Sequence, residues 1–137
     1  MDLSVVIVSY NVRVLLAECL TSLRRSLADS PLTYEIWVID NASTDDSAKM
    51  VRREFPDTHL LANEENKGFA AASNQGIAHS RGRYIFLLNP DTRVLGRATD
   101  VLVAFMERTP RAGMSGARLL YEDGSFQHGA FRFPNLM

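Results

Sequence analysis

Short apolar runs alternate along the chain with longer segments in which apolar residues recur at helical spacing. The runs are rich in β-branched and aromatic residues, as is typical of strands buried on both faces, and they predict strands over residues 3–9, 35–40, 59–62 and 84–88. The amphipathic segments predict helices over residues 15–27, 44–55, 69–78 and 97–108. This alternation predicts an α/β fold, in which a doubly wound, mainly parallel sheet is flanked by helices.

Local chemistry predicts where some of these elements begin and end. Ser43 and Asp46 have the spacing of a capping box, so we expect Ser43 to cap the second helix. Pro56 ends that helix, because proline cannot continue the hydrogen-bonded ladder. Beyond Pro110 the pattern weakens, and it predicts only a short strand over residues 112–116 and a hairpin turn over residues 121–126.

Composition and charge narrow the class of protein. The chain has 137 residues, enough for one domain. Its 15 Lys and Arg residues against 16 Asp and Glu residues give a net charge of −1. This balance disfavours a nucleic-acid-binding module and, with 46% hydrophobic residues, also disfavours disorder. Apolar runs such as residues 84–88 are too short to span a membrane.

The expected location follows from two further features of the sequence. The first residues, Met1 to Ser4, lack the basic segment of a signal peptide. Cys19 is the single cysteine, so it cannot form a disulfide within the chain, which is typical of a reducing compartment. We therefore expect a cytoplasmic protein.

Polar clusters follow four of the predicted strands. They comprise residues 9–11, 40–42, 63–68 and 89–91. In a doubly wound sheet, ligands bind beyond the carboxyl ends of the strands. These four clusters are therefore expected to meet at one edge of the sheet and to form the functional site.

Five candidate residues in or near these clusters each have a structural interpretation as well as a functional one. Asp40 is either a turn residue or a carboxylate that accepts from a base N–H or a ribose hydroxyl. Tyr10 is either a half-buried core aromatic or a platform for a base. Gly68 either forms a loop or admits close approach of a phosphate. Asn74 is either a satisfied helix side chain or a ligand, and Asp91 is either a turn residue or a ligand of Mg²⁺ or Mn²⁺.

Several common functional motifs are missing from the sequence. No G-x-G-x-x-G motif follows the first strand, which counts against dinucleotide binding. The P-loop, the G-x-S-x-G nucleophile motif and metal-binding Cys/His spacing are also absent. These absences leave the oxygen-rich edge of the sheet as the candidate site.

Four segments carry a resemblance to a known family. Residues 6–11 (VIVSYN), 40–47 (DNASTDDS), 66–76 (NKGFAAASNQG) and 87–92 (LLNPDT) resemble the family 2 inverting glycosyltransferases of GT-A fold, in order and spacing. The Asn-Pro-Asp form of the last segment is most similar to the bacterial rhamnosyltransferase-type branch. The resemblance covers about residues 3–130 and implies a Rossmann-like GT-A fold.

The resemblance implies a site for a nucleotide-diphosphate-sugar donor. The residues that match its nucleotide-sugar-binding positions are Ser9, Tyr10, Asp40, Asn41, Ser43, Gly68 and Asn74. Asp91 matches the last acid of the D-x-D metal motif, which implies Mg²⁺ or Mn²⁺ as cofactor. Asn89 stands in the place of the first acid, and an amide is the poorer ligand for a hard cation.

The resemblance also predicts domain organisation and partners. It implies a donor-binding domain over residues 1–117 and the start of an acceptor-binding region over residues 118–137. The acceptor would be a sugar or lipid-linked glycan in cell-surface polysaccharide synthesis, at the inner face of the membrane. The family's general base is expected beyond Met137, because none of the later acids lies in a matching segment: Asp100, Glu107, Glu122 and Asp123. The chain is thus expected to be a truncated, inactive donor-binding fragment whose exposed apolar surface favours self-association.

Two other functions are compatible with parts of this pattern. A non-catalytic nucleotide-binding or assembly module would use the same donor site without turnover. A nucleotidyltransferase of similar architecture would carry a Gly-rich, Arg-containing loop after the first strand, where this chain has SYNVR at residues 9–13.

Overall fold

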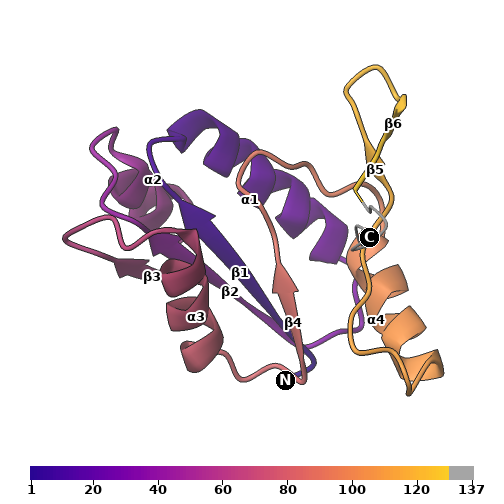
Figure 1. Cartoon of the computed structure of the whole chain (residues 1–137). Helices are drawn as coiled ribbons and strands as arrows, with labels where there is room; N and C mark the ends of the chain where they lie inside the picture. Colours follow the sequence, from indigo (N-terminus) through magenta and orange to yellow (C-terminus); the bar gives the residue numbers. More distant parts are fainter. Residues whose placement is uncertain (130–137) are drawn as a thin grey trace, which may run out of the picture.

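The computed structural model describes residues 1–129 and contains a four-stranded parallel sheet (Figure 1). Its strands stand in the order β3-β2-β1-β4. Their bounds are β1 Leu3–Ser9, β2 Tyr34–Asp40, β3 His59–Ala62 and β4 Tyr84–Leu87. The helices between and after them are α1 Arg13–Leu27, α2 Ser47–Glu54, α3 Phe69–His79 and α4 Ala98–Arg108. The α/β fold with a mainly parallel sheet flanked by helices is confirmed.

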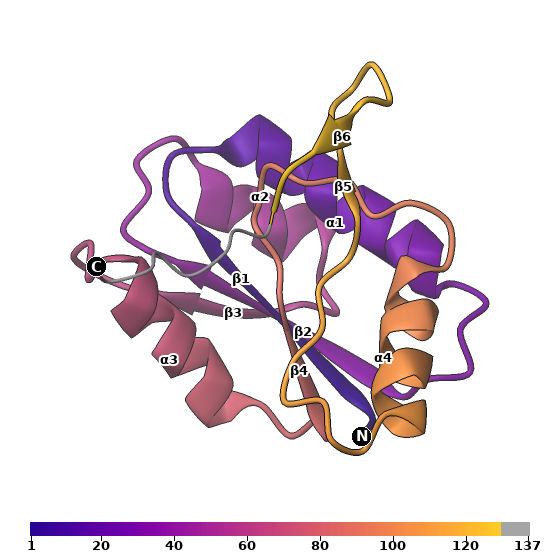
Figure 2. The ribbon, with the colours of Figure 1, turned by 45° about the vertical axis from the view of Figure 1, so that its right-hand side comes forward.

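Helices cover both faces of this sheet, and Figures 1 and 2 show α3 on one side with α1 and α2 on the other. Successive strand residues point to opposite faces. Val5 and Ile7 of β1 therefore join the larger hydrophobic core with side chains of α1, α2 and α4, whereas Val6 joins a smaller core with Ile39 and Ala72 under α3. Apolar runs without polar alternation are what a sheet buried on both faces requires.

The start of α2 differs from the sequence expectation. Helix α2 begins at Ser47, and Ser43 is not its cap. Ala42 and Asp46 both adopt left-handed backbone conformations, with φ of 68° and 64°. These two residues turn segment 41–46 into a loop, so the Ser43 side chain bonds to the neighbouring β1–α1 loop and no capping box forms.

The segment after α4 is irregular. The strand predicted over residues 112–116 is wrong, because this segment is irregular, pairs with no strand among residues 1–129 and leaves the Met114 side chain exposed. The predicted hairpin turn is confirmed: β5 Leu119–Leu120 and β6 Phe126–Gln127 pair antiparallel around it. Figure 2 shows this hairpin projecting from the body of the domain. Of the acceptor-binding region expected over residues 118–137, residues 130–137 lie outside the described part of the chain.

Within residues 1–129, every helix falls short of the length and apolar character needed to cross a bilayer.

Candidate functional site

The carboxyl ends of β1, β2 and β3 meet in register at one edge of the sheet. Ser9 pairs with Asp40, and Asp40 pairs with Ala62 on the next strand. The backbone continues this alignment past the strand ends, because the N–H of Asn41 donates to the carbonyl of Ser9 at 2.8 Å and the N–H of Asn63 donates to the carbonyl of Asp40 at 2.8 Å. The clusters that follow these strands therefore lie side by side, as the sequence predicts.

Asp40 has one carboxylate oxygen with a partner and one without. Its side chain is buried, and Oδ2 accepts a hydrogen bond from the backbone N–H of Ser43 at 3.1 Å. Within residues 1–129, neither Oδ1 of Asp40 nor the neighbouring buried Oγ of Ser9 has a hydrogen-bond partner. Leaving such a buried group unpaired costs about 1–3 kcal/mol. The strand ends thus present acceptor capacity that a ligand N–H or O–H can use.

The loops after β1 and β2 are tied together. The backbone N–H groups of Asn11 and Arg13 donate to Oγ of Ser43 at 3.0 Å and Oδ2 of Asp45 at 2.8 Å. In return, Oδ1 of Asn11 accepts from the N–H of Thr44 at 2.8 Å. Burial raises the pKa of Asp45, but hydrogen bonds, chiefly from the Ser47 hydroxyl and the Arg13 N–H, outweigh it and leave that pKa below its ordinary value.

The contacts between these loops do not involve the aromatic side chain of Tyr10, which lies beside the site and is available to contact a ligand. The ring of Tyr10 stands next to Asn11, directly after the end of β1, and is 50% exposed. An aromatic face in this position can stack on a planar base. The fixed loops on either side hold the backbone of Tyr10 at the edge of the sheet.

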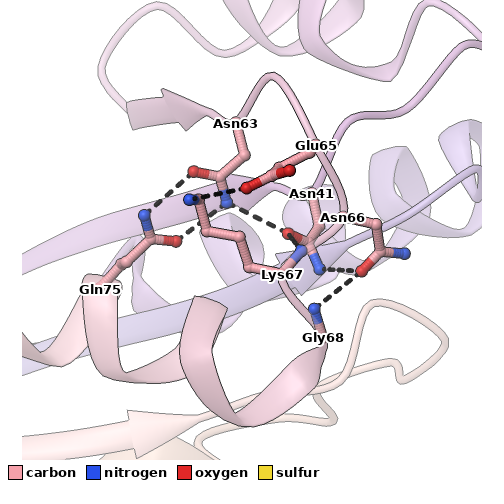
Figure 3. A network of polar contacts seen from close by, with 7 residues as sticks. All are labelled: Asn41, Asn63, Glu65, Asn66, Lys67, Gly68 and Gln75. Atoms are coloured by element: carbon pink, nitrogen blue, oxygen red, sulfur yellow. Dashed lines mark hydrogen bonds and ion pairs between the residues drawn. The ribbon is translucent and has the colours of Figure 1, made fainter.

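The loop after β3 is fixed to the same edge by amide side chains, which Figure 3 shows from close by. Oδ1 of Asn41 accepts from the N–H of Lys67 at 3.0 Å, and Nδ2 of Asn41 donates to Oδ1 of Asn66 at 2.7 Å. The same Asn66 oxygen accepts from the N–H of Gly68 at 2.9 Å. Gly68 has a φ of 79°, a conformation that glycine adopts without strain. Loop 63–68 thereby reaches the start of α3 in a defined shape.

The turn after β4 is anchored on helix α1. The carbonyl of Asn89 accepts from the N–H of Thr92 at 3.2 Å, which closes a turn around Pro90 and Asp91, and it also accepts from Sγ of Cys19 at 3.5 Å. Burial raises the pKa of the Cys19 thiol to about 11, and the negative charge of Asp91 adds to that rise. Cys19 is therefore a protonated packing residue and not a nucleophile.

Residues beyond the turn continue this attachment. Arg93 forms an ion pair with Glu18 at 2.7 Å, and the N–H of Val94 donates to Oγ of Ser22 at 2.9 Å. The segment after β4 is therefore held along the second and third turns of α1, which fixes the position of Asp91 relative to the sheet.

Asp91 is the candidate cation ligand at this turn. Its side chain is exposed and makes no hydrogen bond or ion pair with any of the residues that the structure describes. Across residues 1–129, three or more His, Cys, Asp or Glu side chains nowhere gather into a metal-binding group. Mg²⁺ often binds through one or two carboxylates together with substrate phosphates and water. A free Asp91 carboxylate therefore fits a cation that a diphosphate brings with it, and does not fit a cation held by protein alone.

Comparison with known proteins identifies the family. Residues 4–133 match the family described as Glycosyl transferase family 2. The chain belongs to this family. It is 32% identical to the succinoglycan biosynthesis protein ExoO of Rhizobium meliloti (strain 1021) over 113 residues, which cover 82% of this chain and 31% of ExoO. The chain spans less than half the length of the curated relatives it matches.

Solved glycosyltransferases share the fold. The mannosyltransferase PcManGT from Pyrobaculum calidifontis, in complex with GDP-Man and Mn²⁺, has 30% identity and a TM-score of 0.64 over 72% of this chain and 30% of its own. TarS from S. aureus, in complex with UDP-GlcNAc, has 25% identity and a TM-score of 0.66 over 79% of this chain and 32% of its own. The GT-A type of fold expected from the sequence is confirmed.

The family 2 domain brings together most of the residues expected to bind a donor. The cluster at the ends of β1 and β2 and the start of α3 contains Ser9, Asp40, Asn41, Ser43 and Gly68, with Tyr10 beside it. Asp91 lies on the turn after β4, the strand that pairs with β1. The Asn74 side chain is exposed on α3 and forms no hydrogen bond within residues 1–129. That these residues bind a donor remains a prediction.

Two residues in this region were not among the expected donor-binding residues. Asn63 and Gln75 join their side-chain amides by two hydrogen bonds, at 2.9 and 3.0 Å, and connect the loop after β3 to α3. The signal for Asn63 was present, because it follows the strand end directly. Gln75 lies beside Gly76 on the side of α3 that meets the sheet, and the sequence pattern of Ala72 and Gly76 indicates that side.

The acids considered as candidates for a general base lie in other places. Glu107 forms an ion pair with Arg83 at 2.9 Å and accepts from the Tyr84 hydroxyl at 3.1 Å, at the amino end of β4. Asp100 pairs with Arg97 at 2.6 Å on the first turn of α4. Glu122 and Asp123 are exposed in the turn between β5 and β6. Glu107 is therefore at the end of β4 opposite to Asp91, and Asp100 is engaged by an arginine.

Proposed function

We propose that this chain supplies the donor site of a family 2 glycosyltransferase and binds a nucleotide-diphosphate sugar at the carboxyl edge of its sheet. The observation that carries the proposal is the buried Asp40 side chain, whose Oδ1 lacks a partner within residues 1–129, at the point where β1, β2 and β3 end together. A base with an N–H donor supplies the missing hydrogen bond. A charge-assisted bond of this kind is worth about 1.5–3 kcal/mol.

The remaining parts of the donor are assigned to residues around Asp40. Tyr10, half exposed next to the strand end, stacks on the base. Loop 63–68 forms the wall on the β3 side, and Asp91 faces the diphosphate on the β4 side. A divalent cation, Mg²⁺ or Mn²⁺, supplies positive charge that stabilises the leaving diphosphate when bound. Asp91 would hold that cation through its carboxylate, and Asn89 would contribute at most a neutral amide oxygen.

The proposed reaction is transfer with inversion. An acceptor hydroxyl attacks the anomeric carbon, the bond from that carbon to the diphosphate oxygen breaks, and the nucleoside diphosphate leaves with the bonding electrons. A general base accepts the hydroxyl proton. Because Glu107 and Asp100 are engaged elsewhere, we assign the base to neither of them and propose that this chain alone binds donor without transferring sugar. In this scheme residues 1–117 form the donor domain, and residues from 118 onward begin the acceptor side.

The branch of the family suggests which donor to test first. The Asn-Pro-Asp turn at residues 89–91 resembles the rhamnosyltransferase-type branch, so we propose a nucleotide-diphosphate sugar of the rhamnose type as the first donor to test. The acceptor is a sugar or lipid-linked glycan in polysaccharide synthesis, in line with the name of ExoO, a succinoglycan biosynthesis protein. A cytoplasmic location and self-association also stay predictions from the sequence.

A calorimetric titration tests the donor site directly. The chain is titrated with dTDP, UDP and GDP and with their sugars, each with and without Mn²⁺. We expect at least one diphosphate to bind, with an affinity that rises in Mn²⁺, while the matching nucleoside without phosphates shows no effect of Mn²⁺. A folded chain that binds none of these ligands would contradict the proposal. Transfer of sugar to an acceptor by this chain alone would contradict the proposal that the chain binds donor without transferring it.

A further inference from the structure

Asn41 is buried and uses its side chain internally. It is 2% exposed. Its Oδ1 accepts two hydrogen bonds, from Nδ2 of Asn63 at 3.1 Å and from the N–H of Lys67 at 3.0 Å. An amide oxygen has two lone pairs, so this acceptor is fully used. Its Nδ2 donates to Oδ1 of Asn66 at 2.7 Å, which leaves one N–H without a partner within residues 1–129. Asn41 is therefore poorly placed to be a ligand for the donor.

Asn63 extends the same network to α3. Its Nδ2 donates one hydrogen to Asn41 and the other to Oε1 of Gln75 at 2.9 Å, and its Oδ1 accepts from Nε2 of Gln75 at 3.0 Å. Every side-chain donor of Asn63 is thus engaged. Figure 3 shows Gln75 reaching from α3 to Asn63, and Asn63 in turn facing Asn41. A continuous line of neutral amides connects α3, the loop after β3 and the end of β2.

Loop 63–68 has few other constraints. It contains neither helix nor strand, and residues 64–68 are exposed. Its backbone is held at its first residue, where the N–H of Asn63 meets the carbonyl of Asp40, and at its last, where the carbonyl of Gly68 accepts from the N–H of Ala72. Between these points, the N–H groups of Lys67 and Gly68 bond to the side chains of Asn41 and Asn66. The side-chain amides therefore determine the shape of the loop.

We propose that Asn41, Asn63 and Gln75 are positioning residues for the donor site, and that Asn41 acts by fixing loop 63–68 and not by touching the nucleotide. The proposal rests on the proposed function, since the loop forms one wall of that site. A loop that is correctly shaped only part of the time binds with an apparent affinity reduced by that fraction. Weakening the amide network therefore lowers donor affinity without removing any group that contacts the donor.

The first measurement needs no nucleotide. In Gln75→Glu, the carboxylate still accepts from Nδ2 of Asn63 but no longer donates to its Oδ1, so one hydrogen bond becomes a repulsion between oxygens. We expect hydrogen exchange at the Lys67 N–H to rise about fivefold at pH 7 relative to Gln127→Glu, a matched change on β6. At pH 4, below the ordinary carboxyl pKa of about 4.3, the protonated side chain donates again and the ratio returns towards one.

The second measurement separates a positioning role from a ligand role. Donor affinity is measured for Asn41→Asp, Gln75→Ala and the double variant. Asn41→Asp keeps both acceptor roles but loses the donor to Asn66. If both residues act through one loop, each single change weakens binding about fivefold and the double variant is only slightly weaker than the worse single. If Asn41 touches the nucleotide, the two losses multiply.

The outcomes are distinguishable from failure of the donor site itself. The proposal is supported if hydrogen exchange at Lys67 rises in Gln75→Glu and returns towards the control value at pH 4. It is also supported if the losses of donor affinity in the two single variants do not multiply in the double variant. Unchanged exchange at Lys67 would overturn it, as would multiplying losses in the double variant. A wild-type chain that binds no nucleotide would overturn the donor proposal, and the positioning role with it, whatever the exchange data show about the loop.

Discussion

Gly76 of α3 lies directly against Val6 of β1: a Cβ added at position 76 would stand 2.4 Å from Cγ1 of Val6 and 3.3 Å from Cγ1 of Ile39. Glycine in a helix ordinarily costs about 0.5–1 kcal/mol relative to alanine. Here it allows α3 to approach the sheet closely enough to bring Gln75 within reach of the loop after β3. Gly76 thus weakens α3 as an isolated helix but allows α3 to pack closely on the sheet.

The contact predicts that Gly76→Ala destabilises the fold. Val6 is buried and β-branched, so its methyl group cannot move aside easily. Overpacking of this kind costs about 1–3 kcal/mol, which exceeds the gain in helix propensity. Urea unfolding should show a lower midpoint for Gly76→Ala. The matched change Gly113→Ala, where an added Cβ meets nothing within 4 Å, should leave the midpoint nearly unchanged. Equal midpoints would show that α3 does not pack closely on β1.

A second prediction concerns acid stability and Glu35. Burial raises the pKa of Glu35, but hydrogen bonds from the Ser4 hydroxyl at 2.6 Å and the Arg81 N–H at 2.6 Å outweigh it, so the pKa lies below the ordinary value of 4.5. A carboxyl with a lowered pKa in the folded state stabilises the fold above the unfolded pKa. That contribution is lost as the pH falls from about 4.5 through the folded pKa. In Ser4→Ala, the free energy of unfolding should therefore fall less steeply with decreasing pH in this range. An unchanged dependence on pH would show that Glu35 is not the source of the acid sensitivity.

A third prediction concerns Cys19. Because burial raises the thiol pKa to about 11, the thiolate fraction at pH 8 is very small and the thiol reacts slowly with a disulfide reagent. Unfolding in urea should restore the reactivity of an ordinary cysteine. Rapid modification of the folded chain at pH 8 would show that the turn at residues 89–92 does not cover this position.

A fourth prediction concerns the cation. Asp91→Ala should abolish the part of diphosphate affinity that depends on Mn²⁺, since Asp91 is the charged side chain assigned to the cation, while nucleoside binding persists. Asp29→Ala is a suitable control, because Asp29 is exposed in the loop between α1 and β2, at the opposite end of the sheet. Calorimetry of both variants with and without Mn²⁺ checks this. A full Mn²⁺ effect in Asp91→Ala would place the cation elsewhere.

Most of the fold could be predicted from the sequence, for a physical reason. The central strands are buried on both faces, so they appear as uninterrupted apolar runs, and the prediction of strands at residues 3–9 and 59–62 matches the structure. The start of α2 could not be predicted, because it depends on left-handed conformations at Ala42 and Asp46. Non-glycine residues adopt such conformations rarely, and residue type gives little indication of them.

The site could be predicted only in part. The clusters after each strand converge because parallel strands end at one edge, and this much follows from topology. Which amide on α3 meets the loop depends on the rotation of that helix, which is set by the close contact at Gly76. The structure accordingly brings Gln75 into the network and leaves Asn74 exposed. The contacts of Asn41 to residues 22–26 positions away likewise have no local signature.

The most direct test of the donor site is nucleotide affinity in Asp40→Ala. The variant removes the buried carboxylate that we propose binds the nucleotide base. Binding of the nucleoside diphosphate should therefore weaken about 10- to 150-fold, the equivalent of roughly 1.5–3 kcal/mol. Circular dichroism and urea unfolding establish that the variant is folded. Calorimetry that shows this loss, equally with and without Mn²⁺, is the predicted result. A folded Asp40→Ala chain with wild-type affinity would contradict the account, because the base would then bind away from the end of β2.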